Sequence, residues 1–380
     1  MARTNAVNYT GANQFPMASA GTDIFKKEDV QTLALAVDNH DHSSGKGLVV
    51  SVAGIPAGAI DGSKITDNTV TSAKIADGTI ATADLANNAV TNAKLGTDTA
   101  RLNLLTDGGF EIWQRGNGPF VGNQVYSADR WLQQQGGTST VSVSRATAPD
   151  GASYALQVTY THNAASVVMH IHRLSGESSN LRGKTVTFAV SVLSSVANAV
   201  RLELADGLSN AFSSYHPGNS QWVRLSVTAT PGASAAVLQA RIDLEASGTF
   251  TVDDAMLVVG SVPADYAPLT PTDEWARCLR YYEQSPGNFI GNGYGLTTTA
   301  ADIFYRYMAN KGGVPTITLA AGSAFTLRVI GSNVTCTAIS SASPSQTAVL
   351  LNPSVASGLA VGQGVTLSST GGTITAEWNP

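Results

Sequence analysis

The sequence has little charge and no long hydrophobic run. Lys, Arg, Asp and Glu make up 13% of the 380 residues, and the formal net charge is −5. Binding to nucleic acid or to an anionic membrane requires a basic face, so this balance argues against both partners. No run approaches the roughly eighteen apolar residues that a bilayer span needs, and we expect no membrane insertion.

Cysteine is nearly absent. The chain has two, Cys278 and Cys336, which lie far apart in unlike contexts. Secreted β-rich proteins of this size often carry several disulfides, so we expect this one to gain its stability from burial or from assembly. The N-terminal segment MARTNAVNYTGANQF also lacks the apolar core of a signal peptide, which predicts synthesis in a cytoplasm without export by the usual route.

Glycine and strand-favouring residues are abundant instead. The 37 glycines and the frequent Ser, Thr and Val favour many short strands and turns over long helices. The length allows two or three domains. We therefore predict a mainly β fold.

Between Pro56 and Leu95 the sequence repeats every ten residues, four times. The third position of each unit is Gly or Asn, which accept a positive φ and so predict a tight turn. Each unit offers only two branched apolar side chains for burial, at its fifth and tenth positions. These residues are Ile60, Ile65, Val70, Ile75, Ile80, Leu85, Val90 and Leu95.

Neither a helix nor a straight strand suits this spacing. Apolar residues every five positions advance by about 140° on a helix and form no stripe, and on a strand they alternate between faces. So short a repeat cannot offset the entropy of ordering one chain, but several chains wound around one apolar axis can. The spacing predicts a trimeric, intertwined β-repeat shaft over residues 51–99, with a flexible linker as the alternative.

Residues 100–269 predict a jelly-roll β-sandwich. Eight runs of alternating apolar and polar residues, such as 154–161 and 200–205, follow one another between turn signals. This pattern is typical of two packed antiparallel sheets.

The regions on either side of the shaft and sandwich are shorter. Residues 1–50 hold one weak helical pattern and a polar segment, which suit docking into a partner protein. Residues 270–285 predict a helix, with Thr270 as its cap and Pro271 at its first position. Short strand-like runs complete a small C-terminal β domain over 270–380.

Four motif segments carry a family resemblance: NLLTDGGFEIWQRG (103–116), SADRW (127–131), 252–268 and TPTDEWARCLRYYE (270–283). Together with the decapeptide repeat, they resemble tail-fibre and related virion fibre proteins of tailed bacteriophages. The likeness covers most of residues 38–285. It implies a homotrimer on the virion exterior, with residues 1–50 attached to another virion protein.

The sandwich also resembles a jelly-roll carbohydrate-binding module of glycan-degrading enzymes. Those modules open with an Asn-Leu-x-Asn-Gly-x-Phe-Glu run, in which this chain has Asp107 for the second Asn, and they close with a Val-Asp-Asp strand. Their opening and closing segments lie side by side and often hold a structural calcium. The resemblance implies Glu111 and Asp253 or Asp254 as ligands, since calcium takes carboxylate oxygens. The alternative is that these carboxylates only cap turns.

Two histidines, His40 and His42, flank an aspartate in the N-terminal region. Residues two apart share one face of an extended strand, so three chains would place six imidazoles around a trimer axis. Such a set suits an octahedral transition metal. The resemblance to phage fibres, whose tips use this device, implies the same site here.

Sugar binding needs exposed aromatic rings for the pyranose C–H faces and polar side chains for the hydroxyls. The sandwich offers Trp113, Tyr126, Trp131, Tyr215 and Trp222. Trp131 follows Arg130 within a motif common to the family, and Trp222 alternates with apolar residues, so a structural role is the alternative for both. Similar candidates in the C-terminal region are Tyr294, Tyr305 and Tyr307.

No catalytic set emerges, and we expect no enzymatic activity. No spacing singles out the carboxylate pair that glycoside cleavage needs, and no nucleophile elbow is present. The sequence predicts a homotrimeric phage fibre that adheres to host-surface glycans. The alternatives are a structural adaptor or capsid decoration that binds virion proteins, and a secreted bacterial glycan-binding module.

Overall fold

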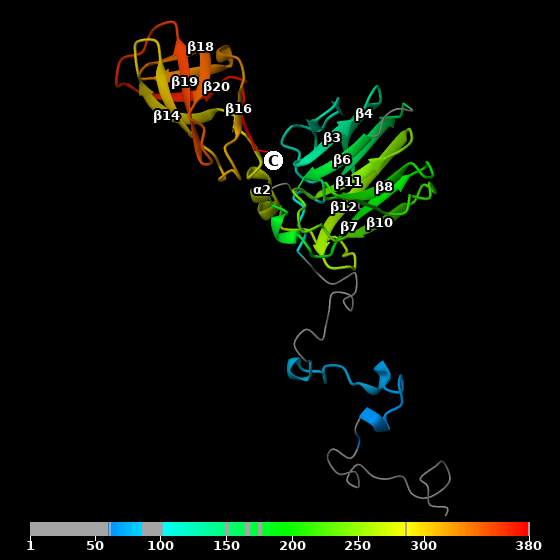
Figure 1. The fold of residues 1–380 in the computed structure, drawn as a ribbon. Helices are drawn as coiled ribbons and strands as arrows, with labels where there is room; N and C mark the ends of the chain where they lie inside the picture. The colour runs from blue at the N-terminus through cyan, green and yellow to red at the C-terminus, as the bar shows by residue number, and fades with distance from the viewer. Residues whose placement is uncertain are drawn as a thin grey trace, which may run out of the picture. The chain divides into compact units, whose positions relative to one another are not determined.

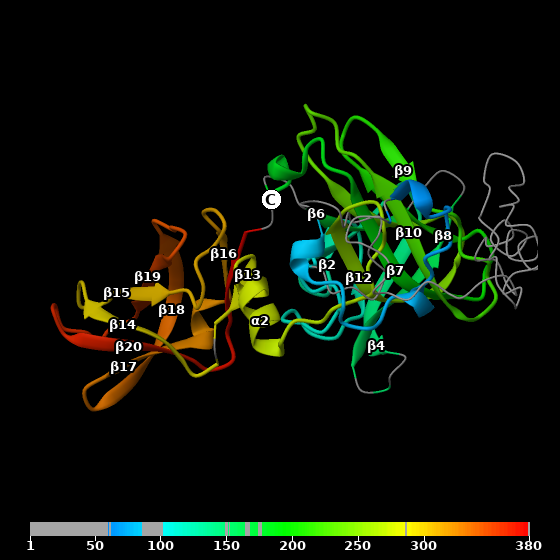
Figure 2. The same cartoon turned by 90° about the horizontal axis from the view of Figure 1, so that it is seen from below.

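The computed structural model describes residues 60, 62–85, 102–148, 151, 153–163, 168–173, 177–285 and 287–378 (Figure 1, Figure 2). The chain divides into two units, Met1–Ala86 and Asn87–Pro380. The predicted attachment region, with His40 and His42, and the shaft residues Val90 and Leu95 lie outside the described residues. Within the ranges above, no helix is long and apolar enough to span a bilayer.

Each described unit of the shaft repeat contains one turn of 3-10 helix, and in the second and third units a tight turn precedes it. The 3-10 turns are η2 (Gly62–Lys64), η3 (Ser72–Lys74) and η4 (Thr82–Asp84). Asn68 and Gly78, at third positions of the repeat, have φ of 65° and 77°, which confirms the predicted turn. No strand occurs over 62–85, so the β character expected of the shaft is corrected there. The turn and the 3-10 segment leave no stretch long enough for a ladder.

The apolar residues of this repeat are exposed in the single chain. Their exposed fractions are 56% for Ile60, 43% for Ile65, 53% for Val70, 41% for Ile75, 54% for Ile80 and 45% for Leu85. Isolated exposed apolar residues are ordinary, so the regular spacing of the series, and not the exposure of any one residue, distinguishes this segment.

Two six-stranded antiparallel sheets form the sandwich, which confirms the predicted jelly roll (Figure 1). Sheet A runs in the order β1 (Phe120–Val121), β4 (Thr140–Thr147), β5 (Tyr154–Thr161), β12 (Gly248–Val259), β7 (Val186–Ser194) and β10 (Trp222–Ala229). Sheet B runs in the order β2 (Val125–Tyr126), β3 (Trp131–Gln135), β6 (Val168–Arg173), β11 (Gln239–Leu244), β8 (Val200–Ala205) and β9 (Asn210–Phe212). A 3-10 turn, η6 (Ser179–Leu181), precedes β7.

The core lies between the two sheets and follows the strand alternation. On β8, Val200, Leu202 and Leu204 are buried in it, as are the alternate residues of β7 and β11. Intervening residues therefore point outward. On β12, the outward residues Met256 and Val258 are covered by the chain that follows the strand.

The helix α2 (Pro271–Leu279) begins as the sequence predicts. The Thr270 hydroxyl accepts a bond from the Asp273 amide at 3.3 Å, which caps the first turn. The helix ends earlier than predicted, because Tyr282 already belongs to strand β13.

The C-terminal β domain is a closed six-stranded barrel beside a three-stranded sheet (Figure 2). Barrel order is β14 (Phe289–Gly295), β15 (Ala301–Arg306), β19 (Ala348–Val355), β18 (Ser332–Ala342), β17 (Phe325–Val329) and β20 (Gly364–Ser369), closing on β14. The small sheet has the order β13 (Tyr282–Gln284), β21 (Ile374–Glu377) and β16 (Thr316–Leu319), and η7 (Gly322–Ala324) precedes β17.

Candidate functional site

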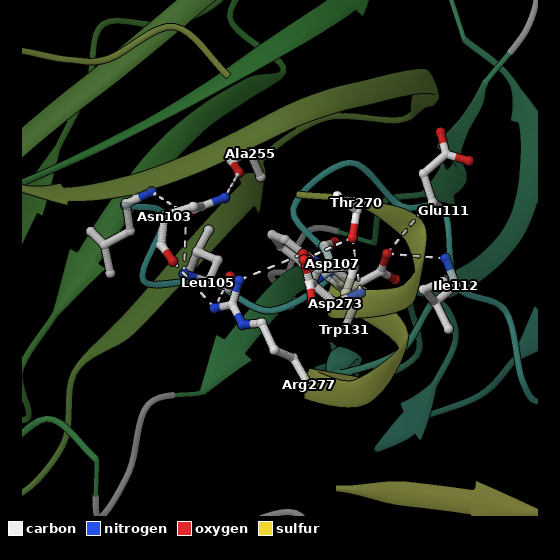
Figure 3. A network of polar contacts seen from close by, with 12 residues as sticks. Asn103, Leu105, Asp107, Glu111, Ile112, Trp131, Ala255, Thr270, Asp273 and Arg277 are labelled. Atoms are coloured by element: carbon white, nitrogen blue, oxygen red, sulfur yellow. Dashed lines mark hydrogen bonds and ion pairs between the residues drawn. The ribbon is translucent and has the colours of Figure 1, made fainter. Parts of the chain in front are cut away.

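The opening and closing segments of the sandwich lie side by side, as the resemblance to carbohydrate-binding modules implied (Figure 3). The Asn103 amide nitrogen donates to the Ala255 carbonyl at 2.8 Å, and its Oδ1 accepts from the Leu257 amide at 3.0 Å. Arg277 of α2 donates to the carbonyls of Asn103 at 3.2 Å and Leu105 at 2.7 Å. The opening segment is therefore held by both the last strand and the helix.

Asp107 is the centre of this arrangement (Figure 3). It is fully buried with a φ of 54°, and its Oδ1 accepts from the amides of Glu111 at 2.8 Å and Ile112 at 3.0 Å. Burial raises the pKa of the Asp107 carboxyl well above its ordinary value, and the neighbouring Asp129 and Glu274 charges add to the effect. These contacts hold residues 107–112 of the opening segment in a turn.

Two predicted sugar-binding residues, Trp113 and Trp131, are buried, and this corrects the prediction for both. Trp131 has no exposed surface, packs against Phe110 with ring centroids 4.7 Å apart, and donates its Nε1 hydrogen to the Asp107 carbonyl at 2.9 Å. Trp113 is 8% exposed and donates to the Phe110 carbonyl. A ring enclosed in this way has no face left for a pyranose.

The motif arginines tie the sandwich to the segment after α2. Arg130 is buried, and its guanidinium lies 3.9 Å from the Tyr281 ring centroid. Arg115 lies 3.7 Å from the Tyr282 ring centroid and pairs with Glu377 at 2.9 Å. Residues of the motifs that carry the family resemblance therefore join the sandwich to the segment that follows α2.

The predicted calcium ligands line one cavity of about 580 Å³, beside Asp107. Glu111 accepts a bond from the Tyr154 amide at 2.9 Å, and its carboxylate points away from Asp107 (Figure 3). Asp253 Oδ1 accepts from the Asp254 amide at 2.7 Å. Across the described ranges, no three His, Cys, Asp or Glu side chains lie close enough to hold a metal ion. The three carboxylates line the same cavity but are not grouped closely enough to hold one ion, and calcium binding stays a prediction.

The outward face of sheet B carries paired charges on β8 and β11. Arg201 donates to Asp243 at 3.0 Å and to Glu245 at 2.7 Å, and Arg241 donates to Glu203 at 3.0 Å. The strand register places Arg201 opposite Asp243 and Glu203 opposite Arg241, so unlike charges alternate over the face. We call these residues, with Phe212 and Tyr215, the Arg201 face.

Aromatic rings border the Arg201 face. The Arg201 guanidinium lies 3.9 Å from the Phe212 ring centroid and 4.8 Å from that of Tyr215. Phe212, which the sequence did not single out, is 45% exposed, and Tyr215 is half-buried. Asp243 Oδ1 is buried without a hydrogen-bond partner among the described residues. The face therefore combines an exposed aromatic ring with two arginines that buried carboxylates hold in place.

The remaining aromatic candidates are spread over the sandwich. Tyr126 lies opposite Leu132 at the other edge of sheet B, half-buried, with Arg115 5.1 Å from its ring centroid. Trp222 is half-buried on β10 of sheet A, where Val223 and Leu225 contact the core. Of the five residues predicted to bind sugar, the structure brings only Tyr215 to the Arg201 face.

We expect the free energy of unfolding to depend on pH because the Asp243 carboxyl is buried. Burial, with help from the Glu245 and Glu203 charges, raises its pKa to about 6 against the opposing effect of Arg201. Between pH 4 and pH 6 the folded chain then keeps a proton that the unfolded chain has lost. The free energy of unfolding should fall as the pH rises through this window, by up to about 1.4 kcal/mol per pH unit for this group.

Urea unfolding at pH 4, 5 and 6 will measure this slope, and Asp243→Asn should reduce it. The control is Asp206→Asn, because backbone hydrogen bonds lower the pKa of Asp206 and place its titration below the window. Equal slopes for the wild type and Asp243→Asn would contradict the assignment.

No family model and no curated protein matches the sequence. Among solved structures, the chain is similar to the family 11 carbohydrate-binding module from Clostridium thermocellum, at 13% identity over 38% of this chain and 96% of that chain, with a TM-score of 0.26. It is similar to the CBM22-1 xylan-binding domain of Paenibacillus barcinonensis Xyn10C, at 16% identity over 43% and 97% of the two chains, with a TM-score of 0.30.

A third similar structure comes from a virus, the enzymatically active domain of bacteriophage CBA120 tailspike protein 4. The identity is 10% over 42% of this chain and 21% of that chain, with a TM-score of 0.30. At this level of likeness the neighbours carry no argument about the function of this chain.

Proposed function

We propose that this chain is a subunit of a homotrimeric virion fibre that adheres to a carbohydrate-bearing surface through its sandwich domain. In this proposal three shafts associate through their apolar residues, residues 1–50 attach to another virion protein, and the β domains carry the binding sites. The chain acts by adhesion and catalyses no reaction.

The observation that carries the proposal is the series of exposed branched residues in the shaft. Six apolar side chains recur every five residues, and each is between 41% and 56% exposed in the single chain. Burying them against sister chains would remove apolar surface from water at roughly 25 cal/mol per Å².

The Arg201 face supports carbohydrate as the ligand. Phe212 offers an exposed ring, and the Arg201 guanidinium beside it offers donors whose charge the buried Asp243 carboxylate nearly cancels. Sugars are recognised by this combination of an aromatic plane with fixed polar groups. Weak single sites suffice, because several sites on one fibre raise avidity by about 10² to 10⁴.

The test measures mass and binding on the full chain. Light scattering after size exclusion should give three times the 39.2 kDa chain mass. On an array of bacterial surface polysaccharides and neutral oligosaccharides, Phe212→Ala should lower binding at least about tenfold, through loss of the stacking surface. The matched control is Tyr154→Ala, which removes a 38% exposed ring that lies against Arg145 on sheet A.

Three outcomes would contradict the proposal. A measured mass of one chain would contradict the trimer. Equal effects of Phe212→Ala and Tyr154→Ala would remove the Arg201 face as the site. A trimer that binds no glycan on the array would favour the structural adaptor instead.

A further inference from the structure

The outward face of the C-terminal barrel carries a second set of aromatic and polar side chains. Tyr294 and Asn292 lie on β14, and Asp302 and Phe304 lie on the neighbouring β15. Tyr294 is 49% exposed and Phe304 is 59% exposed. Tyr305 and Tyr307, which the sequence analysis grouped with Tyr294, are buried in the barrel, and this corrects the prediction for them.

Strand register arranges these four residues in a checkerboard. Tyr294 is paired with Asp302, and Asn292 is paired with Phe304. The two rings therefore lie on one diagonal and the two polar side chains on the other, within reach of one another at about 7–8 Å between Cα atoms. Each ring has polar groups beside it.

Hydrogen bonds from the flanking strands orient the polar members. Asn352 of β19 donates to Asp302 Oδ1 at 2.7 Å, and the Tyr294 hydroxyl donates to Asp302 Oδ2 at 3.4 Å. Thr366 of β20 donates to Asn292 Oδ1 at 2.9 Å. In the part of the chain that the structure describes, the side-chain Nδ2 hydrogens of Asn292 and the side-chain Oδ1 of Asn352 have no partner. These side-chain atoms remain available to a ligand.

Glycines on the inner side of β14 allow this face to form. An added Cβ at Gly293 would lie 1.7 Å from the Asp302 carbonyl oxygen, and one at Gly291 would lie 2.6 Å from that of Phe304. Because no side chain intervenes, β15 approaches β14 closely and its outward residues stand beside those of β14. The close approach positions the checkerboard.

The charge of the face limits the ligand class. Asp302 is the one carboxylate among the members of this face. The nearest outward cation on β15 is the exposed Arg306, two residues after Phe304. An anionic ligand would meet the Asp302 charge, and a purely apolar partner would leave Asn292 and Asn352 unpaired. A neutral polyhydroxyl ligand meets both requirements, because its C–H faces stack on the rings and its hydroxyls exchange bonds with carboxylate and amide groups.

We infer that the barrel face formed by Asn292, Tyr294, Asp302, Phe304 and Asn352 is a second carbohydrate site, specific for a neutral glycan. The inference rests on the proposed function for its class of ligand, but it depends on different residues in a different domain. A fibre with this site binds through the barrel as well as through the sandwich.

The experiment uses the full chain and an array of neutral oligosaccharides of glucose, galactose, mannose and N-acetylglucosamine. Tyr294→Ala and Phe304→Ala should each lower binding of the best ligand at least about tenfold. The matched control is Phe289→Ala, which removes a 54% exposed ring from the same strand, outside the checkerboard. Asp302→Asn keeps the side-chain shape and should also weaken binding, so the test does not depend on an alanine variant that folds poorly.

Separate readouts distinguish this inference from the proposed function. If Phe212→Ala has no effect while Tyr294→Ala and Phe304→Ala lose binding, the proposed sandwich site fails and the barrel site stands. If binding is unchanged in both barrel variants, the barrel site is overturned. If these variants instead reduce the mass to one chain, the face is a subunit interface and the inference is likewise overturned.

Discussion

Replacing Ile75 with aspartate is expected to convert the particle from three chains to one. Ile75 is 41% exposed in the single chain and belongs to the series that the trimer would bury. Three aspartates around one apolar axis would be desolvated and would repel one another, and an unpaired buried charge costs several kcal/mol. Light scattering after size exclusion measures the mass directly.

The neighbouring residue gives a matched control. Lys74→Asp adds the same side chain one position earlier, where the next unit of the repeat already has Asp84. This variant should stay trimeric. If Ile75→Asp kept the wild-type mass, or if both variants dissociated alike, the apolar residues of the repeat would not be the association surface.

Replacing Lys311 with methionine is expected to destabilise the barrel by about 3–5 kcal/mol. The ammonium of Lys311 and the carboxylate of Glu283 are 2.7 Å apart, and both side chains are fully buried. Burial lowers the pKa of Lys311, while its bond to Glu283 opposes this change. Without Lys311, the Glu283 carboxylate keeps the Tyr305 hydroxyl at 2.9 Å but loses the only cation that the described residues place against it.

A double-mutant cycle gives the control for this prediction. Glu283→Gln combined with Lys311→Met removes both charges, and the double variant should recover much of the loss, because neutral partners can be buried at lower cost. Scanning calorimetry of the four proteins measures the stabilities. A loss below about 1 kcal/mol for Lys311→Met alone would contradict a buried pair.

Much of the sandwich could be predicted from alternation alone. The runs 154–161 and 200–205 coincide with β5 and β8, because their apolar and polar residues alternate in the sequence and the core takes Leu156, Val158 and Tyr160 of β5 and Val200, Leu202 and Leu204 of β8. Strand β14 could not be predicted in this way, for a physical reason. Its sequence FIGNGYG holds three glycines, which weaken strand propensity although the barrel requires them for close packing.

The candidate binding residues were harder to predict than the strands. An aromatic residue next to a turn motif gives no sign of its burial. Trp131 is enclosed by residues that lie about twenty positions earlier in the chain, Asp107 and Phe110. Arg201 and Phe212 belong to different strands that only the sheet order brings together. The alternating charges of VRLELA were the available signal for this face, and they indicate an outward surface without indicating a ligand.

The two faces of strand β14 tolerate substitution differently. Gly291, Gly293 and Gly295 meet neighbouring backbone on one side, so any larger residue there would force the strands apart. Asn292 and Tyr294, on the other side, support no part of the barrel core. Substitutions at these two positions should therefore change what the proposed barrel site binds while the strand pairing beneath them stays the same.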